Sequence, residues 1–228
     1  MQFINKHHLI PPDWDAWFTT ANGRRTYDYE ADYGELHNLD LAKNHLINEQ
    51  NGLCAYCQKQ LTISTASIEH IVPKSQNKAL STNYYNLVAV CKNPPVDPLN
   101  NKRHCDKERG NKLLVNIIML QDCQVTKTKN HSYFAANSDG SLSTKHSIIQ
   151  ELSDPIDAFL NILNINHHSI LKNNRAQLLH KIIEPSKNMS HSEKSRYYRA
   201  QFHRILNDKR IEYRQYLLIW FGNKIGIN

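Results

Sequence analysis

Apolar positions at helical spacing define the first regular element of the chain. Residues 37–51, HNLDLAKNHLINEQN, carry apolar side chains that fall on one face of a helix. These are Leu39, Ala42, Leu46 and Ile47. Asn38 or Asp40 is suited to cap the start of this helix, and Gly52 is suited to end it. The pattern therefore predicts an amphipathic helix just before Gly52.

Two short apolar runs follow, and their length is typical of strands. The first lies in SIEHIVPKS, residues 67–75, and the second is NLVAV, which ends at Val90. Prolines in NPPVDPLNN then interrupt regular structure, and CDKERGNK, which begins at Cys105, indicates a short helix. The order strand, strand, helix predicts a small mixed core in this part of the chain.

The rest of the chain predicts a hairpin and then helices. Residues 132–144, SYFAANSDGSLST, place the turn sequence NSDG between two strand-like pieces. From about residue 151 the pattern is helical, through DAFLNILNI, SILKNNRAQLLHKII and RYYRAQFHRILNDKRIEYRQYLLIWF. The fold class is therefore α+β, with a small core flanked by helices. We expect an N-terminal arm at 1–36, the core at 37–115, and a hairpin and helical region at 116–228.

Composition and charge narrow the class of protein. Hydrophobic residues make up 40% of the chain, which is ordinary for a soluble globular protein. No apolar run approaches the roughly 18 residues that span a bilayer, and MQFINKHHLIPP lacks the pattern of a signal peptide. We therefore expect a cytoplasmic protein with no membrane contact. The net charge of +7 is compatible with a polyanionic partner such as nucleic acid.

The cysteines suggest a metal site. An odd number of cysteines, five, argues against a disulfide framework in a reducing compartment. Cys54 and Cys57, in CAYC, have the spacing with which two thiolates grip one zinc ion from a tight turn. Cys91 and Cys105 are the expected remaining ligands. We therefore predict a structural zinc ion held by four cysteines.

Other roles for the cysteines stay open. A looped insertion separates Cys91 from Cys105, so these two do not form the usual second knuckle, and both residues could instead be small buried core residues. His104 could replace Cys105 as a ligand. Cys123, in NIIMLQDC, is interpreted as a core residue.

An acid and an imidazole interrupt the first predicted strand. Glu69 and His70 stand side by side just before Pro73, where the chain turns. At a strand end both side chains can reach one cleft, where one binds a divalent metal ion and the other acts as a base. Asn86 precedes the second strand, and Asp106 opens the short helix, whose dipole favours a carboxylate. The plainer interpretation is a solvated pair at a strand edge.

The order of these motifs resembles that of the HNH nucleases, whose core is a ββα-metal finger. More narrowly, EQNGLCAYC, IEHIVPKS, YYNLVAVC and CDKERG are similar to the PtuB-type HNH proteins of Septu antiphage systems and related retrons, over residues 40–112. The resemblance implies that His70 activates water and that Asn86 fixes the loop that orients His70. It implies that Glu69 and Asp106 hold Mg²⁺ or Mn²⁺.

The resemblance also implies a biological setting. It predicts cleavage of nucleic acid, DNA more than RNA, in antiviral defence together with a PtuA-like ATPase. Two departures from the family pattern affect the catalytic metal site. Glu69 stands where many HNH proteins have Asp, and Asp106 stands where many have His or Asn. If Asp106 is not the ligand, Glu108 is the second choice and His104 the third.

Basic residues outside the motifs allow more than one interpretation. Lys74, Arg109 and Lys112 contact phosphate or belong to a solvated surface. The segment 194–214 interleaves basic and aromatic residues, and we interpret it as an amphipathic helix with a charged outer face. That face could contact nucleic acid or dock the ATPase. Two functions from other classes therefore remain: a non-catalytic, zinc-stabilised nucleic-acid-binding module, and an adaptor for the ATPase.

Overall fold

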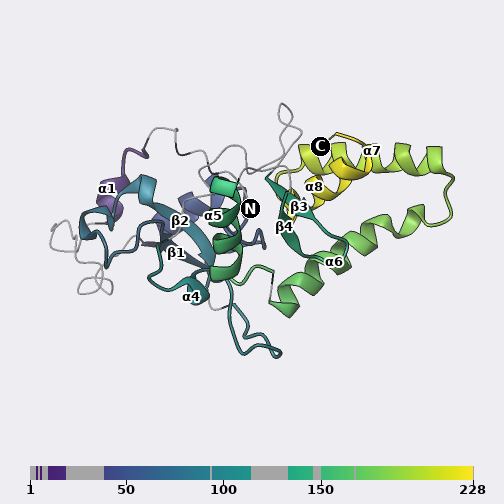
Figure 1. The fold of residues 1–228 in the computed structure, drawn as a ribbon. Coiled ribbons are helices and arrows are strands. Elements are labelled where there is room, and N and C mark those ends of the chain that lie inside the picture. The colour runs from purple at the N-terminus through teal and green to yellow at the C-terminus, as the bar shows by residue number, and fades with distance from the viewer. Residues whose placement is uncertain are drawn as a thin grey trace.

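The computed structural model describes residues 4, 6, 10–18, 39–92, 94–113, 133–145, 150–166 and 168–227. A two-stranded sheet with its covering helix forms the N-terminal half, and helices dominate the C-terminal half (Figure 1). Cys123 and Asn38 lie outside the described residues. In this part of the chain, no helix is both long enough and apolar enough to cross a membrane.

The first predicted helix is present as α3, Leu39–Glu49, after a short helix α1, Trp14–Trp17. α3 packs on both strands of the sheet through its buried apolar face. Gly52 ends it in a left-handed conformation, with φ of 78°, and its N–H donates to the Ile47 carbonyl at 2.8 Å. This conformation suits glycine because a Cβ atom would make the left-handed backbone conformation unfavourable.

The two predicted strands form an antiparallel pair. β1, Ala66–His70, pairs with β2, Leu87–Cys91, so that His70 lies opposite Leu87. Every residue of β2 is buried, which explains its continuous apolar sequence. Two short 3₁₀ helices, η2 at Lys78–Leu80 and η3 at Tyr84–Asn86, lie in the connection between the strands. The predicted short helix is α4, Asp106–Arg109.

The predicted hairpin is also present, as β3, Phe134–Ala136, and β4, Leu142–Thr144. Gly140, in its turn, has a φ of 88° and lies against the backbone of the following helical region. A Cβ at this position would lie 2.0 Å from the Lys172 carbonyl oxygen, so only glycine fits. The turn thereby fixes the hairpin against α6.

Helices make up the C-terminal region as predicted. They are α5, Gln150–Ile162, α6, Ser169–Ile183, α7, His191–Asn207, and α8, Arg214–Lys224, with a 3₁₀ turn η6 at Glu184–Ser186. Residues 208–213 are not helical, so the last helical stretch that the sequence predicts is divided into α7 and α8. Tyr213 is left-handed, with φ of 53°, and its N–H donates to the Gln58 carbonyl at 3.0 Å. A tertiary contact therefore replaces helical hydrogen bonding there.

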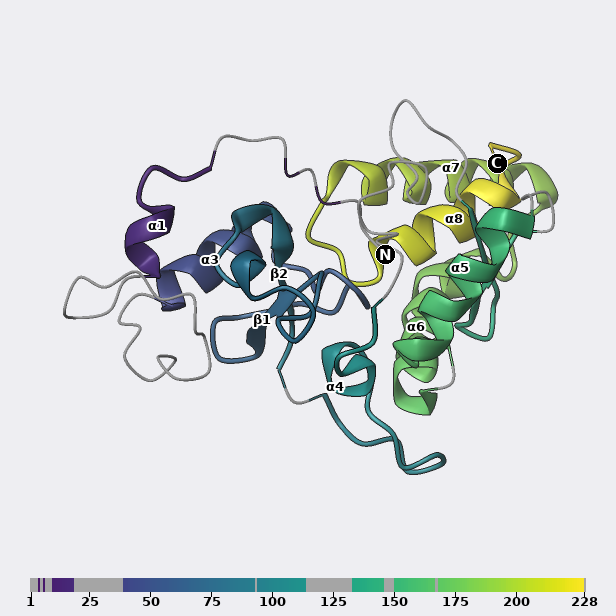
Figure 2. The same cartoon turned by 60° about the vertical axis from the view of Figure 1, so that its left-hand side comes forward.

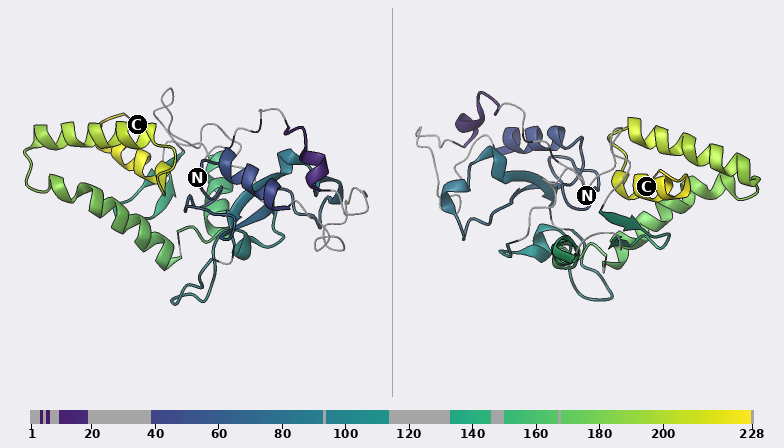
Figure 3. Two further views of the ribbon diagram at one scale, coloured as in Figure 1. Left: turned by 180° about the vertical axis from the view of Figure 1, so that it is seen from behind. Right: turned by 45° about the horizontal axis from the view of Figure 1, so that its top comes forward.

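The two halves of the chain meet close to the cysteines. The Cys105 N–H donates to the Leu163 carbonyl at 3.0 Å, and the Gln215 N–H donates to the Gln58 side chain at 2.9 Å. Beyond this junction α6 and α7 extend away from the sheet, as Figures 1 and 3 show from several sides. α8 packs between α7 and β3.

Candidate functional site

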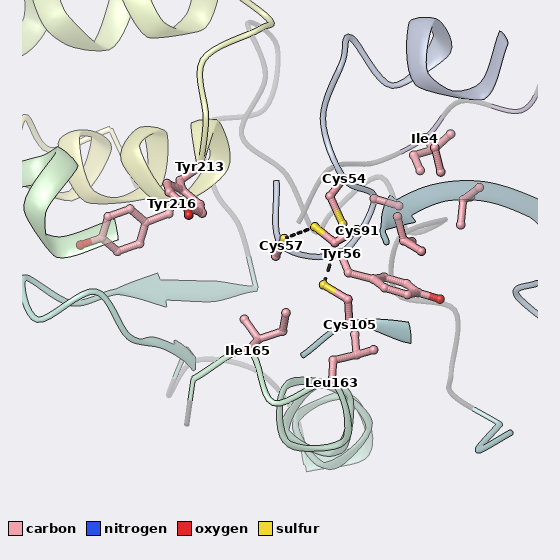
Figure 4. Packing of buried hydrophobic residues seen from close by; sticks show 14 of the residues in the cluster. Ile4, Cys54, Tyr56, Cys57, Cys91, Cys105, Leu163, Ile165, Tyr213 and Tyr216 are labelled. Carbon is pink, nitrogen blue, oxygen red and sulfur yellow. Dashed lines mark hydrogen bonds between the residues drawn. The ribbon is translucent and has the colours of Figure 1, made fainter. Parts of the chain in front are cut away.

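Four buried cysteines converge from three parts of the chain. Their Sγ atoms all lie within 4.8 Å of one another. Cys54 and Cys105 are 3.8 Å apart and Cys57 and Cys91 are 3.5 Å apart, with the sulfurs turned toward a common centre (Figure 4). Four thiolates bound at about 2.3 Å around tetrahedral zinc would lie roughly 3.8 Å from each other. The predicted cysteines therefore have the number and spacing needed to bind one metal ion.

Local backbone geometry explains how the sequence builds this cluster. Cys54 and Cys57 sit in a tight turn, in which the Cys54 N–H donates to the Lys59 carbonyl at 2.8 Å. Cys91 is the last residue of β2, and Cys105 precedes α4. The insertion between Cys91 and Cys105 thus returns the chain to the end of β2. A core role alone would not require the four sulfurs to meet.

The thiols influence one another's ionisation. Burial raises the pKa of Cys105 well above its ordinary value. Burial also opposes ionisation of Cys57, but hydrogen bonds from the neighbouring thiols bring its pKa well below the ordinary value. A cation at the centre is the natural means of holding all four as thiolates.

His104 lies beside this cluster and is outside the set of four. Its ring is 1% exposed, and Nδ1 is 3.1 Å from the Cys105 Sγ. The ring packs edge to face on His168, with centroids 4.7 Å apart. Among the described residues, the four cysteines are the only group of three or more His, Cys, Asp or Glu side chains placed to share an ion. His104 therefore contacts one cysteine of the cluster from outside it, a position typical of a residue that supports a metal ligand.

Glu69 and His70 are not a solvated pair. They are 6% and 7% exposed, which excludes the plainer interpretation of the sequence. The Glu69 carboxylate accepts a hydrogen bond from the Tyr56 hydroxyl at 3.1 Å and forms an ion pair with Arg109. The negative charge of Asp106 also acts on this carboxyl group.

The pKa of Glu69 is raised to about 8. Burial is the main cause, and the negative charge of Asp106 adds to it, while Arg109 opposes both. Two carboxyl groups that interact electrostatically favour sharing a proton or a cation. Glu69 is buried and Asp106, at the start of α4, is half-buried, and the charge of Asp106 acts on the Glu69 carboxyl.

Arg109 has a different position from the one expected. It is 2% exposed, so it is neither on a solvated helix face nor available to phosphate. Besides its contact with Glu69, it donates to the carbonyls of His70 at 2.8 Å, Ile71 at 2.6 Å and Lys112 at 2.9 Å. Arg109 thus ties α4 to the end of β1. Lys112 is exposed and Lys74 half-buried, so both reach the surface.

The His70 ring is oriented by the loop that follows it. Its Nε2 lies 2.9 Å from the Ser81 carbonyl oxygen. A carbonyl can only accept, so Nε2 donates and the lone pair of the neutral ring is at Nδ1. Burial lowers the pKa of His70 to about 4, against the effect of the Ser81 carbonyl. The ring is therefore neutral, and able to accept a proton, at physiological pH.

Asn86 holds this loop closed. Its Oδ1 accepts from the Val72 N–H at 2.7 Å, and its Nδ2 donates to the carbonyls of Val72 and Leu80, both at 3.1 Å. Leu80 is next to Ser81, whose carbonyl holds His70. Asn86 therefore joins both ends of the loop that positions the imidazole, which is the geometry that its expected role requires.

The structure separates the alternatives to Asp106. The Glu108 carboxylate accepts from the Arg103 N–H at 3.2 Å and pairs with Lys102 at 3.6 Å, so it faces the preceding loop. His104 belongs to the cysteine cluster. Of the three candidates, Asp106 is the one whose charge raises the pKa of Glu69.

Sequence reasoning missed two partners of Glu69. Tyr56 lies between the first two cysteines, and in the sequence it looks like an ordinary spacer residue of the metal knuckle. In the structure its buried hydroxyl contacts both Glu69 and Arg109. Arg109 reads as an ordinary surface residue of a short helix. Only their positions inside CAYC and CDKERG could have drawn attention to them.

Comparison with known proteins agrees with this geometry. Residues 54–93 match the family model described as HNH endonuclease. The match includes Glu69, His70 and Asn86 but ends before Cys105 and Asp106. The chain is also 32% identical over 78 residues to the CRISPR-associated endonuclease Cas9 of Corynebacterium diphtheriae. That alignment covers 34% of this chain and 6% of the relative, so the likeness concerns one segment of a much longer protein.

Proposed function

We propose that this chain is a metal-dependent HNH-type endonuclease that hydrolyses phosphodiester bonds in nucleic acid. In this proposal β1, β2 and α4 form the ββα-metal core. The observation that carries it is the buried Glu69–His70 pair at the end of β1, which Arg109 ties to α4, the helix that begins at Asp106. The match of residues 54–93 to HNH endonucleases supports it independently.

Glu69 and Asp106 are the proposed ligands of Mg²⁺ or Mn²⁺. One or two carboxylates are enough for such an ion, because water and substrate phosphate complete its octahedral shell. When bound, the ion neutralises charge that develops on the phosphate and the leaving oxygen. Arg109 and Tyr56 hold Glu69 in place by hydrogen bonds, so its carboxylate is oriented before the ion arrives.

His70 is the proposed general base. Its neutral ring takes a proton from the attacking water, and the Ser81 carbonyl stabilises the imidazolium that results through Nε2–H. Asn86 is a positioning residue, because it acts through the loop that carries Ser81. The four cysteines are proposed to hold a structural zinc ion. That ion fixes Cys105 and, through it, the adjoining residue Asp106.

We further propose that the chain acts in antiviral defence with a PtuA-like ATPase. The support is the similarity of EQNGLCAYC, IEHIVPKS, YYNLVAVC and CDKERG to PtuB-type proteins. The adaptor alternative predicts that the helical region alone retains the ATPase. Co-purification of the ATPase with the full chain, and with a chain that ends near residue 150, separates these possibilities.

The test of the nuclease proposal is a cleavage assay on DNA and RNA in Mg²⁺ or Mn²⁺, with the ATPase supplied. His70→Ala and Asp106→Asn should each lose cleavage while keeping zinc and fold. The matched control is His180→Ala, at an exposed position of α6, which should cleave like wild type. Binding of nucleic acid by wild type with no metal-dependent cleavage would instead favour the non-catalytic module.

A further inference from the structure

A polar groove of about 400 Å³ lies along the outer side of α3, away from the His70 end of β1. Its walls are α3, the segment 60–63 that leads into β1, and Arg210 from the C-terminal region. Side-chain amides and one hydroxyl line it beside the apolar Ile47, Leu61 and Ile63: Asn44, Asn48, Asn51, Gln60 and Thr62. Among the described residues that line the groove, none is acidic. Such a lining offers donors, with little charge repulsion, to an anionic ligand.

From Arg196 onward the outward face of α7 is basic, while Glu193, in the first turn, is held by the Ser190 capping box. Arg196, Arg199, His203 and Arg204 are exposed and lie on one side of the helix, opposite the buried Phe202 and Ile205. Within the described part of the chain, no carboxylate forms an ion pair with these arginines. Like charges at such spacing destabilise a helix slightly, and a merely solvated face normally mixes both signs. This face of α7 is therefore better suited to binding a polyanion than to remaining only hydrated.

Arg210 connects the two features. It is exposed just beyond the end of α7, and it also lines the groove. The Gln60 N–H donates to the Glu212 carboxylate at 2.9 Å, which anchors the connecting segment beside the groove. Figure 2 shows this segment running from α7 toward the half of the molecule that holds the sheet. Arg210 therefore belongs both to the groove lining and to the run of exposed arginines that continues from α7.

We propose that this surface, the basic track of Arg196, Arg199, Arg204, Arg210 and the groove, binds the phosphate backbone of nucleic acid. Exposed arginines along one helix and just beyond its end can contact several phosphates, and the amides of the groove suit phosphate, sugar or base edges. The inference rests on the proposed function for the class of ligand. It adds a contact remote from Glu69 and His70, which keeps a long substrate attached while the nuclease site engages.

Equilibrium binding without added divalent metal tests the track separately from cleavage. The probes are labelled duplex DNA, single-stranded DNA and single-stranded RNA, measured over a range of salt concentrations. The variant R196Q/R199Q/R204Q should weaken binding at least about tenfold and reduce the slope of log affinity against log salt by about 2 to 3. The matched control K145Q/K181Q/K187Q removes the same charge elsewhere and should change both values less.

Two substitutions on α3 test the role of the groove. Asn48→Trp fills the groove and should weaken binding with little change in salt slope, because no charge is removed. Leu41→Trp is the control, since Leu41 is an exposed residue of α3 outside the groove lining. Thermal unfolding of all variants shows whether the fold is kept.

The outcomes separate this inference from the nuclease proposal. Unchanged affinity and salt slope in the triple variant, with normal cleavage by wild type, overturns the track and assigns the face to another partner, such as an acidic protein. Weakened binding in the triple variant supports the track whether or not wild type cleaves. Absence of cleavage by wild type counts only against the nuclease.

Discussion

Arg109 pairs with Glu69 inside the protein, across 40 positions of sequence. The same guanidinium holds the His70 and Ile71 carbonyls. One side chain of α4 therefore fixes both a proposed metal ligand and the backbone that carries the proposed base. This makes the integrity of the site depend on a residue that never meets substrate.

Removing this guanidinium should be costly. Arg109→Met leaves the Glu69 carboxyl and two carbonyls without their hydrogen-bond donor, and we expect a loss of about 3–5 kcal/mol in the free energy of unfolding, because each buried polar group left unpaired costs about 1–3 kcal/mol. Urea denaturation of the zinc-loaded protein measures it. Lys107→Met, at an exposed position of the same helix, should change this value by less than about 0.5 kcal/mol. A loss below about 1 kcal/mol for Arg109→Met would show that these contacts are unimportant.

The cysteine cluster predicts one zinc ion per chain. Cys57→Ser and Cys105→Ser should each lower the bound zinc strongly, because three thiolates and a weaker hydroxyl bind it poorly, and both should lower the melting temperature. Cys123→Ser is the control and should keep its zinc. Elemental analysis of purified protein measures the content. Full zinc in the Cys105 variant would remove that residue from the proposed ligand set.

Metal binding at the proposed nuclease site should depend on pH. The pKa of Glu69 near 8 means that this carboxyl is largely protonated in the metal-free protein below pH 8. Because Mn²⁺ needs the carboxylate, its affinity should fall toward tenfold per pH unit as pH decreases below about 8, with release of about one proton on binding. Calorimetric titration of zinc-loaded protein in two buffers measures both. Glu108→Gln should behave like wild type, and constant affinity from pH 6 to 9 would contradict the shift.

Asn86 should affect rate more than stability of the zinc site. Asn86→Ala releases the loop that holds Ser81 against His70, and we expect cleavage to fall about 100-fold, because small displacements of a catalytic group are costly. Asn77→Ala, in the same loop, loses only a local cap of η2 and should cleave nearly like wild type. The comparison is of single-turnover rates at equal zinc content. Equal rates for both variants would mean that the Asn86 contacts do not orient the base.

Local sequence signals predicted the elements around the site. Helical spacing of apolar residues, short apolar runs and turn residues predicted α3, β1, β2 and the β3–β4 hairpin, because these signals depend on neighbours in sequence. The spacing of Cys54 and Cys57 indicated a metal knuckle for the same reason. The convergence of Cys91 and Cys105 with them followed from chemistry, since tetrahedral zinc needs four ligands.

Contacts between distant segments were harder to predict. Arg109 has the sequence context of a surface residue, and its burial results from the packing of α4 against β1. The break between α7 and α8 follows from the bond between Tyr213 and Gln58, which no local pattern indicates. The joint lining of one groove by Arg210 and α3 likewise appears only when the two halves are assembled.

The most direct test of the account is a crystal structure of the zinc-loaded protein soaked with Mn²⁺, with anomalous scattering recorded at the edges of both metals. The account predicts a zinc peak at the centre of the four cysteines and a separate manganese peak between the carboxylates of Glu69 and Asp106. Manganese bound elsewhere, with these two carboxylates unligated, would contradict it.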